Sequence, residues 1–71
     1  MTHFIINIYD NNKMDFVREQ IKFEGDLITA KKFSLSLARR LKLKDGVIYI
    51  YEKNDYYRGD DCLAAIDYYK K

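Results

Sequence analysis

The chain has 71 residues, of which 48% are apolar and 34% charged, and its net charge is +2. This length allows one domain, residues 1–71, with apolar residues enough for one core, and the composition is neither that of a disordered chain nor that of a membrane protein. Cys62 is the only cysteine, which excludes an intramolecular disulfide and a cysteine-rich metal site.

The first residues do not have the pattern of a secretory signal, because Ile5 and Ile6 run directly into Asn7 and no basic region precedes them. The longest apolar run, residues 46–51, is too short to cross a bilayer. Small secreted domains usually carry disulfides. We therefore expect a cytoplasmic protein that does not associate with a membrane.

The N-terminal third predicts a β-hairpin. Residues 3–9 alternate as a strand does, with one apolar face and with Tyr9 on the other. Residues 10–13 are turn residues that tolerate left-handed backbone. Residues 15–24 alternate again, and Glu19 falls on the apolar side of this second strand, which indicates an edge strand.

Residues 29–42 predict the main helix. Thr29 can cap its start, and basic residues toward its end suit the helix dipole. At the helical period, the apolar residues gather on one side, which we expect to be buried: Ala30, Phe33, Leu37 and Leu41, with Ala38 beside them.

Residues 47–52 form the clearest strand, since they are mostly β-branched or aromatic. Residues 60–71 are ambiguous. Two aspartates at the start, two lysines at the end and two alanines slightly favour a helix. A period of two instead gives a strand, with one apolar face made by Cys62, Ala64, Ile66 and Tyr68.

The predicted fold is thus α+β, a small antiparallel sheet of three or four strands with one main helix packed on one face. In chain order this is a ββαβ core followed by a C-terminal helix or strand. The outline is similar to that of β-grasp domains, a resemblance of element order that implies no function.

The residues that catalysis or metal binding would need are mostly missing. His3 is the only histidine, so a catalytic triad or a two-histidine metal site would depend on it. Cys62 has no second suitable base near it in sequence and is typical of a small core residue. The acidic residues after the third strand do not have the spacing of a calcium-binding loop: Glu52, Asp55, Asp60 and Asp61. We expect a protein that is not an enzyme, with no catalytic residue, no metal and no cofactor.

Positive charge is concentrated in the middle of the chain, because residues 27–44 hold six cations and no acid, while the segments on either side each carry two more acids than cations. On the predicted helix, the side opposite the apolar residues carries cations with Leu35 among them. A leucine surrounded by cations indicates a contact surface for phosphates or for an acidic protein patch. These candidate partner-binding residues are Lys31, Lys32, Leu35, Arg39 and Lys42.

Tyrosine is the second unusual feature, with seven residues and no tryptophan. Tyr49 and Tyr51 share one face of the third strand. If the helix covers the other face, they gather with Tyr9, Arg18 and Lys22 on the open side of the sheet. Aromatics interleaved with cations can stack nucleic-acid bases, whereas tyrosine is also common in protein interfaces.

The net charge of +2 is low for a strong nucleic-acid binder. We therefore expect a small regulator or inhibitor that docks on a larger protein partner. Accessory proteins of phages and other mobile elements have this size, and inhibition of a nucleic-acid enzyme is one form such a function takes. The alternative is a nucleic-acid-binding module that uses the basic helix and the tyrosine-rich face.

Overall fold

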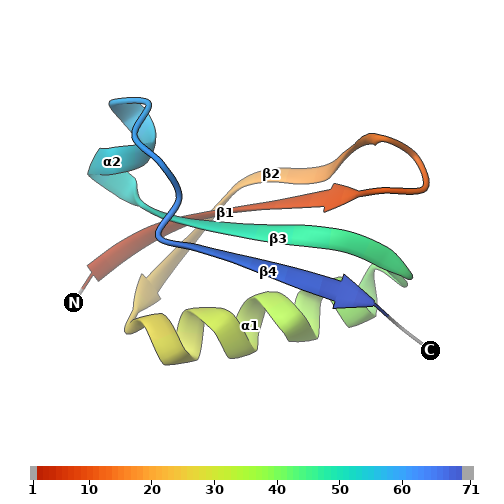
Figure 1. Ribbon diagram of the computed structural model, residues 1–71. Helices are drawn as coiled ribbons and strands as arrows, with labels where there is room; N and C mark the ends of the chain where they lie inside the picture. The colour runs from red at the N-terminus through yellow and green to blue at the C-terminus, as the bar shows by residue number, and fades with distance from the viewer. Residues whose placement is uncertain (1, 70–71) are drawn as a thin grey trace.

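The computed structural model describes residues 2–69. In chain order its elements are β1 (Thr2–Asp10), β2 (Asp15–Gly25), α1 (Leu27–Arg40), β3 (Asp45–Glu52), α2 (Lys53–Tyr57) and β4 (Ala64–Tyr69). The strands form one sheet in the order β2-β1-β3-β4, and every neighbouring pair is antiparallel. The helix α1 lies along one face of this sheet, and the short helix α2 lies on the opposite face at one end (Figure 1). The predicted α+β class, with one main helix on an antiparallel sheet, is confirmed.

The ambiguous C-terminal segment is a strand, so the slight preference for a helix is wrong. From Cys62 to Tyr68 every second side chain is partly buried, which is the period of the alternative prediction. Ile66 lies opposite Ile48 of β3. The free edge of β3 offers a full ladder of hydrogen bonds, and this outweighs the helix propensity of two alanines. Lys70 and Lys71, which the predicted element included, lie outside the described residues.

The core lies between α1 and the central strands. Its largest fully buried side chains on that face are isoleucines of β1 and β3: Ile6, Ile8, Ile48 and Ile50. The helix contributes small residues, Ala30, Ser34 and Ala38, which recur every fourth position and are all fully buried. Ser34 satisfies its hydroxyl by donating to the carbonyl of Lys31 at 2.8 Å. Small residues let the helix approach the sheet closely, so the larger side chains flank the contact.

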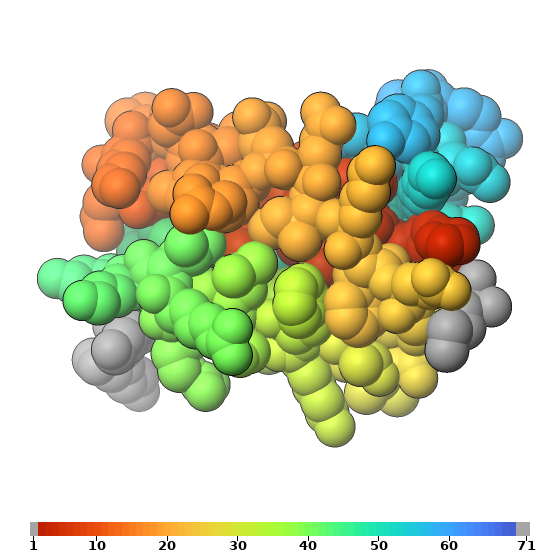
Figure 2. Space-filling model, turned by 180° about the vertical axis from the view of Figure 1, so that it is seen from behind, coloured from red at the N-terminus to blue at the C-terminus, as the bar shows by residue number. Residues whose placement is uncertain are grey.

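Phe33 is one of these flanking residues, and its predicted burial is wrong. It is 36% exposed and stacks on Phe23 of β2, with ring centroids 4.9 Å apart. The contact closes the β2 side of the helix–sheet interface, where β2 and α1 lie side by side in Figure 2. Leu37 and Leu41 pack against the core, as expected of the apolar side, but they are only partly buried.

The helix begins two residues earlier than predicted, because Asp26 and not Thr29 is its N-cap. The Asp26 carboxylate accepts a hydrogen bond from the Thr29 backbone N–H at 2.7 Å. This bond, followed by a weaker hydrogen bond to the Thr29 side chain, lowers the pKa of Asp26. Burial opposes the shift, and the charge of Lys32 adds to it.

The helix also ends two residues earlier than predicted. Leu41 is the C-cap, and Lys42 has left-handed backbone with φ 59°. The N–H of Lys42 donates to Arg39 O, and the N–H of Leu43 donates to Ala38 O at 3.0 Å. This pattern is a Schellman motif, and it buries Leu43 in the core.

The predicted edge position of β2 is confirmed, and bulges explain its awkward glutamate. The β1–β2 register shifts on both sides of Ile8, and Gln20 adopts a left-handed φ of 55°. The buried Asn7 side chain accepts a hydrogen bond from the Gln20 N–H at 2.7 Å and so holds the bulge. The extra residue lets Glu19 remain exposed. In the hairpin turn, the left-handed residue is Met14 and not one of the asparagines.

Candidate binding surfaces

The eight candidate residues lie on opposite sides of the molecule. Those from the basic segment belong to α1 and the turn after it, and Tyr9, Tyr49 and Tyr51 lie on β1 and β3. Alternation along these strands points the tyrosines away from the isoleucines that face α1. We call the sheet face opposite α1 the open face. α2 lies on that face near one end, against β1 and β3 (Figure 1).

Three aromatic residues from three strands meet on the open face, and we call them the aromatic triad: Tyr9, Phe16 and Tyr49. The ring of Phe16 makes an edge-on contact with Tyr9, with centroids 5.0 Å apart, and lies 6.3 Å from that of Tyr49. The hairpin register sets this contact, because Tyr9 and Phe16 are directly opposite. Tyr9 and Tyr49 are partly buried and Phe16 is 38% exposed.

Phe16 is not among the residues predicted from the sequence, although it is an aromatic residue on the side of residues 15–24 opposite the apolar one. Its position beside Tyr9 follows from the register of the hairpin, and this register cannot be read from the sequence because of the bulges around Ile8. Bulges shift the register of all residues beyond them, so the alternation of a strand does not predict which residues lie opposite each other there.

Tyr51 belongs to a second aromatic group at the α2 end of the open face. Its ring makes an edge-on contact with Tyr56, at 5.1 Å, and Tyr56 makes a similar contact with Tyr57 at 5.5 Å. Burial raises the pKa of Tyr51, and the nearby ionisable groups of Cys62, Tyr49, Tyr56 and Asp61 raise it further. Ile5, opposite Tyr51 in the register, is completely buried although it points to the open face. α2 therefore covers this end, and the end with the aromatic triad stays uncovered.

Charges of both signs flank the open face. Lys22 lies opposite Ile5, and Asp67 lies opposite Val47, which places one cation and one acid on this face. Arg18 lies opposite Ile8, which faces α1, so its predicted place beside the tyrosines is wrong. The bulges on both sides of Ile8 change the alternation of β2 here. Arg18 is exposed, and its guanidinium donates to the neighbouring carbonyl of Val17. The open face is therefore mixed in charge, and the interleaved pattern of aromatics and cations is present only in part.

The basic surface lies on the other side of the molecule. Lys31, Lys32 and Arg39 are exposed on α1, and Lys42 is exposed in the turn that follows. Within residues 2–69 the ion pairs join Arg58 to Asp55 and Asp60, and none involves a cation of α1.

Leu35 does not lie among these cations on the solvent side, so that part of the prediction is wrong. It is partly buried and packs against the core. The cause is the helix position: small residues occupy its closest line to the sheet, which turns Leu35 toward one flank of the interface. The most exposed large apolar residue of α1 is Ile28, near its start.

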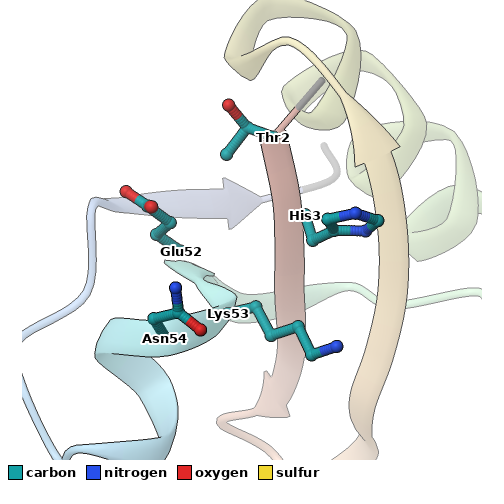
Figure 3. Close-up of a pocket in the computed structure, with 5 residues that line it drawn as sticks. All are labelled: Thr2, His3, Glu52, Lys53 and Asn54. Carbon is teal, nitrogen blue, oxygen red and sulfur yellow. The ribbon is translucent and has the colours of Figure 1, made fainter.

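A shallow hollow lies at the end of the sheet where β1 begins and α2 starts. Figure 3 shows the residues around it: Thr2 and His3 on β1, Glu52 at the end of β3, and Lys53 and Asn54 at the start of α2. His3 and Lys53 both extend toward β2 and also line an adjoining hollow. His3 forms no side-chain hydrogen bond with another described residue. Between residues 2 and 69, no three His, Cys, Asp or Glu side chains gather as a metal site would require.

The acidic segment after β3 is organised around Arg58. Its guanidinium contacts Asp55 at 2.5 Å and Asp60 at 3.7 Å. These contacts, with the hydrogen bond to Asp55 foremost, raise the pKa of Arg58. The carboxylates are thus partly neutralised by a cation at the end of α2.

Comparison with protein-family models, curated proteins and solved structures finds no match to the chain. In the part of the chain that the structure describes, no helix is long and apolar enough to span a membrane.

Proposed function

We propose that the chain is a non-enzymatic binding protein that docks on a larger protein partner through its open face. The observation that carries this proposal is the aromatic triad, in which Tyr9, Phe16 and Tyr49 form a contiguous and partly exposed group. Aromatic side chains are enriched in protein interfaces, where they bury large area at low entropic cost. Regulation or inhibition of that partner is the form of activity we favour for a domain of this size.

The separation of aromatics and cations supports a protein partner over a nucleic acid. A single-stranded nucleic acid on an open sheet needs stacking rings and backbone-tracking cations on one surface. Here the cations of α1 and the aromatic triad lie on opposite sides of the sheet (Figure 1). On the open face, Asp67 lies close to the strands that carry the triad and opposes phosphate binding.

The basic surface of α1 supports the second candidate, a nucleic-acid-binding module. Its exposed cations are clustered, and no described acid pairs with them. Such a surface would bind phosphates in a manner that weakens steeply with salt. At physiological salt we expect no binding to single- or double-stranded oligonucleotides tighter than the roughly 10⁻⁴–10⁻⁶ M of non-specific contacts. Submicromolar, length-dependent binding that Lys32→Ala with Arg39→Ala abolishes would favour this second function.

The test compares two variants as baits in a pull-down from the native cell lysate, with and without nuclease. The first, Phe16→Thr with Tyr49→Thr, removes two triad rings and keeps strand-favouring residues. The second, Lys32→Ala with Arg39→Ala, removes two cations and leaves the open face unchanged. Circular dichroism melting checks that both variants fold.

We expect the unmodified chain and the cation variant to capture the same protein in equal amounts, with or without nuclease. The triad variant should not capture it. Capture that nuclease abolishes, or that only the cation variant loses, would contradict the proposal.

A further inference from the structure

The two edges of the sheet differ in how well they are protected from pairing with another strand. β2, at one edge, carries two register shifts, a left-handed residue and several charges. These are the features that keep an edge strand from adding a neighbour. β4, at the other edge, has a regular register with β3 from Tyr69 to Ala64 and no proline. Between Leu63 and Tyr69 its single charged residue is Asp67.

The exposed apolar residues at the β4 edge are placed at its two ends. Leu63, just before β4, is 52% exposed, and Tyr69, its last residue, is 72% exposed. Alternation puts both on the open face, with Ala65 and Asp67 between them.

The other face of β4 is only partly covered. α1 packs mainly against β1, β2 and β3. Ile66 and Tyr68 of β4 are partly buried against the core. Phe33 projects from the flank of α1 that faces β2, where it stacks on Phe23. Leu35, two residues further, projects from the opposite flank, because successive helical residues turn by about 100°. Leu35 therefore lies on the flank of α1 away from β2, which is the β4 side. Leu35, Ile66 and Tyr68 are all partly buried against the core and make up a partly exposed apolar strip on this side.

We propose that a second copy of this chain pairs with β4, so that two sheets join about a two-fold axis into one antiparallel sheet of eight strands. The sequence of β4 favours its own copy as the occupant. Residues opposite each other in an antiparallel pair share a face, so a two-fold axis normal to the sheet must pass beside a residue. The axis beside Ile66 places the stretch from Leu63 to Tyr69 against its copy. Leu63 contributes its side chain to this contact and not its N–H, because that N–H donates to the Ile50 carbonyl at 2.8 Å.

In this register each exposed apolar residue finds a complementary one. Leu63 lies opposite Tyr69 of the second copy, and Ile66 lies opposite its own equivalent. Ala64 faces Tyr68, and Ala65 faces Asp67, so small residues meet larger ones. The register with its axis beside Asp67 instead places two carboxylates directly opposite each other, which is destabilising. The pairing also brings the two apolar strips together on the helix side.

This dimer is independent of the proposed function, because the aromatic triad lies on β1, β2 and β3 and stays exposed in it. Loss of dimer formation would leave the docking proposal standing, and the reverse also holds.

Disulfide trapping tests the register, with Cys62 replaced by Ala in every chain. Opposite residues of an antiparallel pair have Cα atoms about 4.5–5.5 Å apart, which suits a disulfide. Leu63→Cys alone, or Tyr69→Cys alone, places the two equivalent thiols about 20 Å apart. We expect neither single variant to form a covalent dimer under mild oxidation, and an equimolar mixture of the two to form a mixed one.

A charge pair tests whether the same contact holds the dimer in solution. Leu63→Lys with Tyr69→Lys places like charges opposite each other at both ends of the interface. Leu63→Lys with Tyr69→Glu removes the same apolar groups but places opposite charges there. Both sites are exposed in the single chain, so the fold is expected to persist in both variants.

By sedimentation equilibrium we expect the unmodified chain to reach twice its monomer mass as its concentration rises. The Lys/Lys variant should raise the dimer dissociation constant on the order of tenfold over the Lys/Glu variant. An unmodified chain that stays monomeric at millimolar concentration would overturn the proposal. Equal dissociation constants for the two variants, or trapping in the single variants and not in the mixture, would overturn it as well.

Discussion

Gly46 lies where the packing of the sheet leaves no room for a side chain. A Cβ atom added there would lie 2.1 Å from the Tyr9 carbonyl oxygen and 2.9 Å from a methyl carbon of Leu43. Ordinary carbon–oxygen contacts between strands are about 3.3–3.6 Å. Gly46→Ala therefore requires β1 and β3 to separate locally by more than about 1 Å. Both are central strands, and Leu43 is held by the Schellman motif.

Overpacking a core typically costs about 1–3 kcal/mol, and more when backbone must move. We expect Gly46→Ala to lower the free energy of unfolding by at least about 3 kcal/mol. The whole domain is expected to be stable by roughly 4–11 kcal/mol, from its length. Urea denaturation followed by circular dichroism measures the difference. Gly59→Ala is the matched control, because a Cβ there meets nothing within 4 Å and only the φ of 78° is strained. Its expected cost is about 1–2 kcal/mol. If Gly46→Ala were no more destabilising than Gly59→Ala, the β1–β3 register or the position of Leu43 would be wrong.

Three further predictions concern single positions. Lys42→Gly should stabilise the domain by up to about 1 kcal/mol in the same urea assay, because glycine adopts the left-handed C′ position without strain. Asp26→Ala should lower the melting temperature by several degrees at pH 7, whereas Asp26→Asn, also a good N-cap, should not. The pKa of Asp26 is lower in the folded than in the unfolded chain, so its carboxylate stabilises the fold fully above the unfolded pKa of about 3.9. This stabilisation disappears as the pH falls through the folded pKa. The difference in melting temperature between the unmodified chain and Asp26→Ala should therefore vanish in acid. In a spectrophotometric titration of the tyrosines, Tyr51→Phe should remove a phenol whose pKa lies above the usual value of about 10. If the phenol that disappears has an ordinary pKa, the burial of Tyr51 is contradicted.

The sequence predicts the parts of the fold that depend on local periodicity. The strands around Phe4, Ile6 and Ile48 alternate cleanly, and the helix carries a clear apolar side. Their burial in one helix–sheet core follows from the need to cover both apolar surfaces. The edge position of β2 is also predictable, because Glu19 cannot point into a core.

The sequence does not predict features set by contacts between distant elements. The closest line of α1 to the sheet is made by Ala30, Ser34 and Ala38, and a hydrophobicity pattern gives little weight to such small residues. For this reason the hydrophobicity pattern predicts Phe33 in the core and Leu35 on the solvent side, and both predictions are wrong. β4 needs the free edge of β3 as its template, which no local pattern reveals. A five-residue helix such as α2 is too short to form alone, and it depends on the contact of Tyr56 with Tyr51.

The candidate site was predictable to the same degree. The sequence predicts Tyr9, Tyr49 and Tyr51 on the face opposite the helix, and they lie there. The grouping of Tyr9 and Tyr49 around Phe16 depends on the hairpin register, which bulges alter. Whether this surface binds a partner stays a prediction.

Site-specific photo-crosslinking tests the proposed binding surface most directly. A photoreactive phenylalanine analogue at Phe16 keeps an aromatic ring in the triad, and the same analogue at Lys32 reports on the exposed surface of α1. After irradiation in the native cells, we predict that the Phe16 chain forms a discrete protein adduct that nuclease treatment leaves unchanged, and that the Lys32 chain does not form it. Adducts from Lys32 alone, or adducts that nuclease digests, would contradict docking of a protein on the open face.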